Sequence, residues 1–268
     1  MSNEISIVIT GVAGKMGSET AKAVLAEEPE LRLVGAVDPR EAGVDLGDII
    51  RVPDCEIKVS EHLNQVLAST QADVVVDFTN PQAVLENAKT ALENGAAPVI
   101  GTTGLDVVGI AELQKLSERA DRAVLIVPNF ALGAVLMMDF ARYAARYFNN
   151  VEIIEMHHDQ KIDAPSGTAL KTAQMIQQER EPFTQGHPEE YEKLTGARGG
   201  ESEGIRIHSV RLPGLVAHQE VIFGSPGQTL TIRHDSLHRE SFMPGVLMAI
   251  RKVRELKGVV IGLEKILD

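Results

Sequence analysis

The sequence predicts an α/β protein with a Rossmann-like, doubly wound parallel sheet, plus a second α+β domain that has a mixed, mostly antiparallel sheet. Three observations support this prediction. Strand and helix patterns alternate over the first half of the 268 residues, and strand patterns dominate much of the second half. A glycine turn follows the first strand directly, as dinucleotide-binding units require. Aromatic residues make up only 4% of the chain, with no Trp, and this composition favours helices around a buried parallel sheet.

Length, charge and cysteine content exclude several classes of protein. The chain exceeds the roughly 250 residues at which single cores stop growing, so we expect two domains. The formal net charge is -12 without any run of Lys and Arg, so nucleic acid is not an expected partner. A single cysteine, Cys55, excludes an internal disulfide framework and favours a reducing, cytoplasmic location. The N-terminus lacks the basic start of a signal peptide, and no apolar run reaches the roughly 20 residues that cross a bilayer, so no membrane association is expected.

The first strand and the turn after it predict a nucleotide site. Ile5 to Thr10 form a β-branched run, and a helix is expected through about Ala26. Between them the glycines have the spacing G-x-x-G-x-x-G, whereas G-x-G-x-x-G is the commoner form. Such a turn lets backbone N–H groups approach a pyrophosphate, although a tight turn without any ligand would have the same pattern. The candidate cofactor-binding residues are Gly11, Val12, Ala13, Gly14, Lys15 and Met16.

A second strand, Leu31 to Val37, ends on Asp38, roughly 20 residues after the last glycine of the turn. An acid at this place accepts hydrogen bonds from the ribose hydroxyls of NADH. Arg40 is close enough in the chain to meet the 2′-phosphate of NADPH instead. The sequence is therefore compatible with either NADH or NADPH as the cofactor.

Further strands are expected at 73–76, 98–100 and 123–127, with helices at about 81–94 and 107–119. Each strand is followed by a polar or glycine-containing turn. In a doubly wound sheet these strand ends line one crevice, where a bound nicotinamide would lie. The candidate residues in these turns are Phe78, Thr79, Gly101, Thr102, Thr103, Val127, Pro128, Asn129 and Phe130.

The second half of the chain changes character. We expect a helix at about 132–148, a strand at 151–156, a helix from Ala169 to about Arg180 and a mobile polar loop at 181–203. Three strands, 204–211, 216–223 and 228–233, are then expected to form an antiparallel meander with one apolar face, which another subunit would cover. The tail from Phe242 should return to the first domain. The expected limits are 1–129 with 239–268 for the dinucleotide-binding domain, and 130–238 for the substrate-binding and oligomerisation domain.

Proton carriers and anion binders are densest between Glu155 and Leu170. His157, His158 and Lys161 precede a Ser166-Gly167-Thr168 turn that opens a helix. Unpaired N–H groups at a helix start bind carboxylates or phosphates, and His and Lys move protons at neutral pH. Helix capping by Ser166 or Thr168 is the simpler interpretation of the turn alone. Because neighbouring strand residues point to opposite faces, only one of the two histidines is expected to be catalytic unless the strand has ended.

Four more histidines accompany the predicted meander. They lack the i, i+4 helical spacing with a carboxylate that is typical of a metal site, so we expect no metal and interpret them as structural. They are His208, His218, His234 and His238.

In the motifs described above and in the others named below, the chain resembles the bacterial 4-hydroxy-tetrahydrodipicolinate reductases (dihydrodipicolinate reductases) of lysine and diaminopimelate biosynthesis. The resemblance covers nearly the whole length and is most specific over the run from His157 to Ala169. The other matching motifs are the glycine turn at 11–17, Asp77-Phe78-Thr79, Gly101-Thr102-Thr103-Gly104 and Pro128-Asn129-Phe130.

The resemblance implies NADH- or NADPH-dependent reduction of 4-hydroxy-tetrahydrodipicolinate, a cyclic imine dicarboxylate, to tetrahydrodipicolinate by a homotetramer. It also implies that His157 and Lys161 transfer protons, while His158, Gly167 and Thr168 bind substrate. The chain departs from some members of the family at Pro39, where they have a basic residue, and this puts a strong NADPH preference in doubt. Two rival hypotheses are another two-domain NAD(P)-dependent dehydrogenase of amino or hydroxy acids and a catalytically silent nucleotide-sensing protein.

Overall fold

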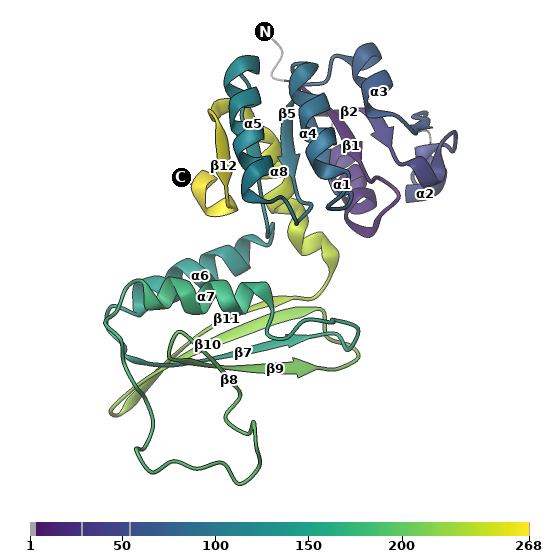
Figure 1. Ribbon diagram of the computed structural model, residues 1–268. Helices are drawn as coiled ribbons and strands as arrows, with labels where there is room; N and C mark the ends of the chain where they lie inside the picture. Colours follow the sequence, from purple (N-terminus) through teal and green to yellow (C-terminus); the bar gives the residue numbers. More distant parts are fainter. Residues whose placement is uncertain (1–3, 28, 54, 268) are drawn as a thin grey trace. The chain divides into compact units, whose positions relative to one another are not determined.

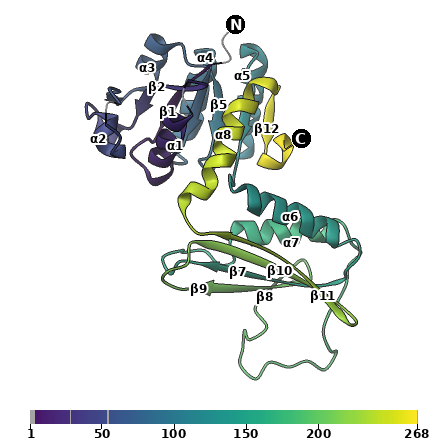
Figure 2. The same cartoon turned by 180° about the vertical axis from the view of Figure 1, so that it is seen from behind.

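The computed structural model describes residues 4–27, 29–53 and 55–267. These residues form two compact units (Figures 1 and 2). The first unit ends at Phe130 and resumes at Phe242, and the second unit is Ala131–Ser241. None of the helices in the described ranges is both long and apolar enough to cross a membrane.

The first unit is built on a seven-stranded sheet with the order β12-β6-β5-β4-β1-β2-β3, in which every hydrogen-bonded pair is parallel. Its strands are β1 (Ile5–Thr10), β2 (Leu31–Val37), β3 (Val59–Ser60), β4 (Val74–Asp77), β5 (Ala97–Ile100), β6 (Val124–Ile126) and β12 (Val259–Ile261). Its helices are α1 (Lys15–Ala26), α2 (Leu46–Ile50), α3 (Leu63–Thr70), α4 (Val84–Glu93), α5 (Val107–Ala120) and α8 (Met243–Lys252), with short 3-10 turns η1 (Pro39–Glu41), η3 (Val253–Glu255) and η4 (Leu263–Ile266).

Helices cover both faces of this sheet. Helices α3, α4 and α5 lie side by side on one face, and α1 and α8 lie together on the other (Figures 1 and 2). All four residues of β4 and of β5 are consequently buried, which explains their continuous rather than alternating apolar pattern. The predicted doubly wound parallel sheet is confirmed. The sequence patterns did not reveal α2, β3 and α3, which fill the stretch between Glu41 and Gln71.

The second unit is a five-stranded mixed sheet with two helices. Its strands are β7 (Asn150–His157), β8 (Gly200–Ser202), β9 (Ile205–Arg211), β10 (Ala217–Ser225) and β11 (Gln228–Ser236), and its helices are α6 (Leu132–Ala144) and α7 (Gly167–Gln177), followed by the 3-10 turn η2 (Arg239–Phe242). The strand order is β11-β10-β7-β9-β8. The predicted type of sheet, mixed and mostly antiparallel, is therefore confirmed.

The predicted meander is wrong in one connection. Strand β9 does not pair with β10, because β7 lies between them, parallel to β9 and antiparallel to β10. Of the three strands predicted for the meander, β10 and β11 form a hairpin, whereas β9 forms a hairpin with β8. The chain leaves β7, passes through α7 and β8, and returns beside β7 as β9. Because β10 lies on the other side of β7, the link from Leu212 to Val216 crosses the end of β7 instead of making a tight turn.

The apolar face of this sheet is covered by its own chain, which corrects the expectation that another subunit must cover it. Helices α6 and α7 both lie on one face (Figure 1). On that face Ile153, Ile205, Val221 and Phe223 are fully buried. The opposite face is mixed, with half-buried aliphatic residues between charged ones: Glu152, Ile154, Met156, Arg206, His208, Val210, Glu220 and Ile222.

Candidate active site

The glycine turn after β1 has the geometry of an anion-binding turn. Gly11 is left-handed with φ 74°, and a Cβ there would lie 2.3 Å from the carbonyl oxygen of Phe78. A Cβ on Gly17 would lie 2.2 Å from the carbonyl oxygen of Gly11, so α1 packs directly on the turn. No side chain caps α1 at Gly14, which leaves the N–H groups of its first turn available to an anion.

Asp38 ends β2 and is engaged with Arg40. The Asp38 carboxylate accepts hydrogen bonds from Nε and Nη2 of Arg40, at 3.0 and 2.9 Å, and from the backbone N–H of Ala13 at 3.2 Å. Burial would raise the pKa of Asp38, but the bonds from Arg40 outweigh it, so the pKa is lowered. The Arg40 side chain is 71% exposed, so it can move away from Asp38 at little cost in packing. Asp38 and Arg40, the two predicted cofactor contacts after β2, thus form one ion pair.

The three turns predicted to converge do meet at the ends of β4, β5 and β6. The rings of Phe78 and Phe130 lie 5.6 Å apart, and a Cβ on Gly101 would collide with both rings. Val127 is buried and donates its N–H to the carbonyl oxygen of Ile100. Thr103 and Pro128 are exposed, and Asn129 is half-buried. These turns are therefore packed against one another, with Thr103 and Pro128 at the surface.

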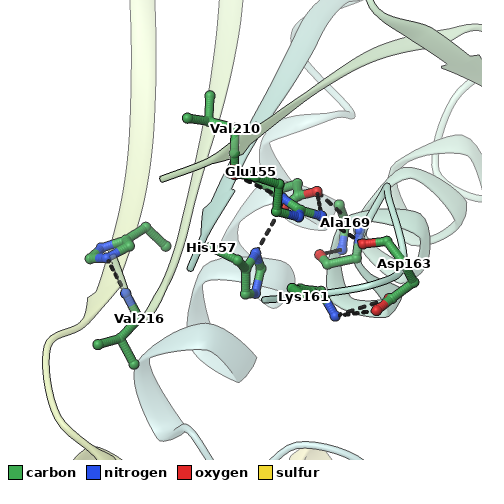
Figure 3. Close-up of polar contacts among 10 residues, drawn as sticks. Glu155, His157, Lys161, Asp163, Ala169, Val210 and Val216 are labelled. Atoms are coloured by element: carbon green, nitrogen blue, oxygen red, sulfur yellow. Dashed lines mark hydrogen bonds and ion pairs between the residues drawn. The ribbon is translucent and has the colours of Figure 1, made fainter. Parts of the chain in front are cut away.

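The second cluster begins at Glu155 on β7, a fully buried carboxylate. One of its oxygens lies 2.6 Å from Nδ1 of His157 (Figure 3). Burial would raise the pKa of Glu155, but hydrogen bonds from Arg211, Ser209 and His157 lower it below its ordinary value, so Glu155 is ionised. An ionised Glu155 can only accept, so the proton of His157 lies on Nδ1 and Nε2 keeps its lone pair.

Burial also lowers the pKa of His157, and it outweighs the opposing effect of Glu155. The positive charges of Lys161 and Arg211 lower the same pKa further. His157 is therefore neutral at pH 7, because its ordinary pKa is already about 6.5. A neutral His157 with a protonated Nδ1 presents an acceptor, not a donor, at Nε2.

Lys161 lies close to His157, in the loop that follows β7 (Figure 3). Its ammonium group contacts both oxygens of Asp163, at 2.7 and 2.9 Å. That contact lowers the pKa of Asp163. The second flanking acid, Asp159, instead accepts a hydrogen bond from the amide of Gln160. Of the two flanking acids, Asp163 therefore pairs with the lysine.

Arg211, on β9, is the functional residue that the sequence patterns missed. Its guanidinium makes two parallel bonds to Glu155, at 2.9 and 2.7 Å, and one of 2.8 Å to the carbonyl oxygen of Asp163. It thereby neutralises the buried carboxylate and fixes the loop that carries Lys161. Removing one partner of such a buried pair typically costs about 3–5 kcal/mol. In the sequence, the need for a cationic partner is indicated by Glu155, a charged residue at a position on the buried face of β7.

The start of α7 combines a side-chain cap with an exposed glycine. The Ser166 hydroxyl accepts a hydrogen bond from the N–H of Ala169 at 3.2 Å, and the N–H of Ser166 donates to Glu155. Both polar groups of Ser166 are thus used within the protein, as the capping interpretation requires. Gly167 is exposed, and a Cβ there would meet nothing within 4 Å. Thr168 is half-buried beside it. The space for an anion therefore lies at Gly167 and Thr168.

Three further histidines, His158, His208 and His218, lie in different surroundings. His158 is exposed and follows β7, which ends at His157. The alternation of side chains between the two faces of a strand therefore does not turn His158 away from His157. His208 pairs with Glu152 at 2.7 Å, and His218 pairs with Asp235 at 2.7 Å while accepting the N–H of Val216. Within the described ranges, no group of three or more His, Cys, Asp or Glu side chains could hold a metal ion.

The parallel sheet with its glycine turn, and the separate cluster of proton carriers, define a two-unit protein of the dinucleotide-binding oxidoreductase class. The family model "Dihydrodipicolinate reductase, N-terminus" matches residues 5–130, and "Dihydrodipicolinate reductase, C-terminus" matches residues 133–267. The chain therefore belongs to the dihydrodipicolinate reductase family.

Individual relatives agree with this assignment. Proteins named 4-hydroxy-tetrahydrodipicolinate reductase from Desulfitobacterium hafniense (strain DSM 10664 / DCB-2) and Moorella thermoacetica are each 54% identical, over 99% and 98% of both chains respectively. The solved structure of dipicolinate-bound dihydrodipicolinate reductase from Paenisporosarcina sp. TG-14 is 47% identical. It has a TM-score of 0.88 and covers 98% of this chain and 100% of its own. Amine dehydrogenase from Mycobacterium smegmatis, at 17% identity and a TM-score of 0.68, shares the fold alone.

Proposed function

We propose that this protein reduces 4-hydroxy-tetrahydrodipicolinate to tetrahydrodipicolinate, with loss of water, in lysine and diaminopimelate biosynthesis. Membership of the dihydrodipicolinate reductase family supports this function. The observation that carries it is the cluster of Lys161 paired with Asp163, a neutral His157 and the exposed Gly167 at the start of α7 within one short segment. Another two-domain NAD(P)-dependent dehydrogenase of amino or hydroxy acids has no need of that combination.

The residues of the first unit fit a nicotinamide dinucleotide. The uncapped start of α1 offers N–H groups to the pyrophosphate, and the close approach of Gly11 to Phe78 leaves no space for a side chain between the two turns. Asp38 would meet the ribose hydroxyls. The turns that end in Thr79, Thr103 and Phe130 would hold the nicotinamide end, which supplies the hydride when bound.

Lys161 is the proton donor in this proposal. Hydride addition to an unsaturated nitrogen heterocycle leaves negative charge on nitrogen, and an acid must deliver a proton there. The ammonium group of Lys161 pairs with Asp163, whereas burial keeps His157 neutral. The lone pair on Nε2 of His157 can then accept a hydrogen bond from the ammonium group or from the substrate, which positions the proton for transfer.

The start of α7 would bind a substrate carboxylate. The N–H groups of Gly167 and Thr168 lie at the positive end of the helix, where anions bind favourably. The exposed His158 follows β7 and would contact the same or the second carboxylate. The relative from Paenisporosarcina was solved with dipicolinate bound, and a ring dicarboxylate of that kind suits these contacts.

Both NADH and NADPH are proposed as cofactors. Asp38 suits the two ribose hydroxyls of NADH and repels a 2′-phosphate. Arg40 would have to leave Asp38 to reach that phosphate, and its exposure allows this. The ion pair therefore leaves each cofactor one favourable contact, and NADH should serve at least as well as NADPH.

A cytoplasmic homotetramer is also proposed. The single cysteine supports the location. The half-buried aliphatic residues Ile154, Met156, Val210 and Ile222, on the sheet face opposite α6 and α7, support assembly through the second unit. That mixed face, rather than the helix-covered apolar one, would be the contact surface.

The experiment that tests the reaction is cofactor oxidation followed at 340 nm. Purified protein is mixed with NADH or NADPH and the product of the preceding aldolase-type synthase reaction. We expect an absorbance loss that depends on that product. Protein that binds NADH yet shows no substrate-dependent loss would contradict the proposed reaction.

A further inference from the structure

The carboxylate of Asp77, at the end of β4, is buried among neutral hydrogen-bond donors. One oxygen accepts from the hydroxyls of Thr79 and Thr102, at 2.7 and 2.5 Å, and from the N–H of Thr79 at 3.1 Å. The other accepts from the Thr10 hydroxyl and the Asn87 amide, each at 2.8 Å. Asp77 is 1% exposed, and within the part of the chain that the structure describes the side chains bonded to its carboxylate are all neutral. Its negative charge is thus solvated by dipoles but not neutralised.

These donors come from the turns assigned above to the cofactor. Thr10 immediately precedes Gly11, Thr79 follows Phe78, and Thr102 follows Gly101. The hydroxyls of Thr79 and Thr102 and the backbone N–H of Thr79 are engaged with Asp77, so these groups hold the turns in place and are not offered to a ligand. Asp77 therefore ties the ends of β1, β4 and β5 together and places a net negative charge beneath them.

We propose that Asp77 is a positioning residue whose buried charge favours the oxidised nicotinamide over the reduced one. This inference rests on the proposed function only in placing the nicotinamide at these turns. When the reduced ring gives up a hydride, with its two electrons, the ring changes from neutral to cationic. A buried, uncompensated anion nearby stabilises the cation, since low polarity and the absence of salt leave its field poorly screened. The same field assists departure of the hydride.

The test is the ratio of dissociation constants for NAD⁺ and NADH, measured by calorimetry in Asp77→Asn. An asparagine fits the same space, because the Thr10 hydroxyl can turn toward the carbonyl oxygen of Val76, 3.4 Å away, and the Asn87 amide can flip. We expect NAD⁺ binding to weaken about three- to tenfold more than NADH binding. A purely structural role would change both constants equally, and an unchanged ratio would overturn the inference.

Asp73→Asn is the matched control. Asp73 lies at the opposite end of the same strand and accepts the N–H of Ser6 at 2.9 Å, a bond that asparagine keeps. Its ratio should equal that of the wild type; a shift as large as that of Asp77→Asn would overturn the inference. Asn87→Lys adds a cation beside an intact Asp77 and should move the ratio of the NAD⁺ and NADH dissociation constants in the same direction as Asp77→Asn. If Asp77→Asn does not fold, Asn87→Lys serves as the test instead.

The two proposals can fail separately. Wild-type turnover with an unmoved ratio in the variants contradicts the role of Asp77 alone. A normal ratio shift without any turnover of the synthase product contradicts the proposed reaction alone. A wild-type protein that binds neither form of the cofactor contradicts both.

Discussion

Replacing Lys161 by Ala should abolish most of the catalysis while leaving the fold intact. Within the described ranges, the ammonium group of Lys161 makes its hydrogen bonds and ion pair with the Asp163 side chain alone, and that carboxylate is 61% exposed. An exposed pair of this kind contributes about 0–1 kcal/mol to stability. Loss of a general acid lowers kcat about 10²–10⁴-fold, which corresponds to roughly 3–5 kcal/mol of barrier. The expected catalytic loss is therefore several times the expected loss of stability.

Steady-state kinetics at 340 nm and thermal melts measure the two effects on the same preparation. NADH affinity, measured by fluorescence, should stay at the wild-type value because Lys161 belongs to the second unit. Lys161→Arg provides the matched comparison, since arginine keeps the positive charge but does not give up its proton. We expect arginine to recover KM but not kcat.

The result that would refute this reasoning is a Lys161→Ala variant with near-normal kcat and a raised KM. Lys161 would then only pair with the substrate charge, and His157 would have to be the acid. That outcome would also require His157 to be protonated in the complex, against the lowered pKa that burial gives it in the free protein.

Four further predictions follow from individual contacts. Arg40→Ala should weaken NADPH binding more than NADH binding, and equal losses in titrations with both cofactors would show that Arg40 does not contact the 2′-phosphate. His158→Ala should raise KM with little change in kcat, as for a substrate carboxylate contact; a kcat loss as large as that of Lys161→Ala would contradict this. Because the pKa of His157 is lowered and its neutral form is required, kcat/KM should be constant as pH falls to about 6.5 and should decrease only below it; a decrease that begins near pH 7.5 would exclude a neutral His157. Light scattering should give about four times 29.0 kDa at micromolar concentration, and the monomer mass would exclude the tetramer.

The sequence identified the dinucleotide-binding unit well because its signals are local. β1, the glycine turn and Asp38 are consecutive features of one strand-turn-helix-strand segment, so spacing alone placed them. The region from Glu41 to Gln71 gave no signal because its elements are short. β3 has two residues and α2 has five, too few for a hydrophobic period to emerge.

The sequence could not predict which strands pair when they lie far apart in the chain. Pro213 and Gly214 between two strands are typical of a hairpin, yet β9 pairs with β7, more than 40 residues earlier in the chain. The contact between Glu155 and Arg211 follows from that same pairing, because it brings the two strands side by side. A glutamate on the buried face of β7 indicates that a partner must exist, but it does not identify the partner.

The order of the chain affects how the protein is made on the ribosome. The first sheet is completed by β12, which pairs with β6 and is synthesised only after the whole second unit. Until Val259–Ile261 emerge, β6 has a neighbour on one side only, and its other edge is an unpaired row of backbone donors and acceptors. The uninterrupted segment Ala131–Ser241 is complete before that edge is closed, so the second unit can fold first. A nascent chain halted just before Val259 would thus carry a complete second unit together with a first sheet whose β6 edge is still open to pairing with another chain.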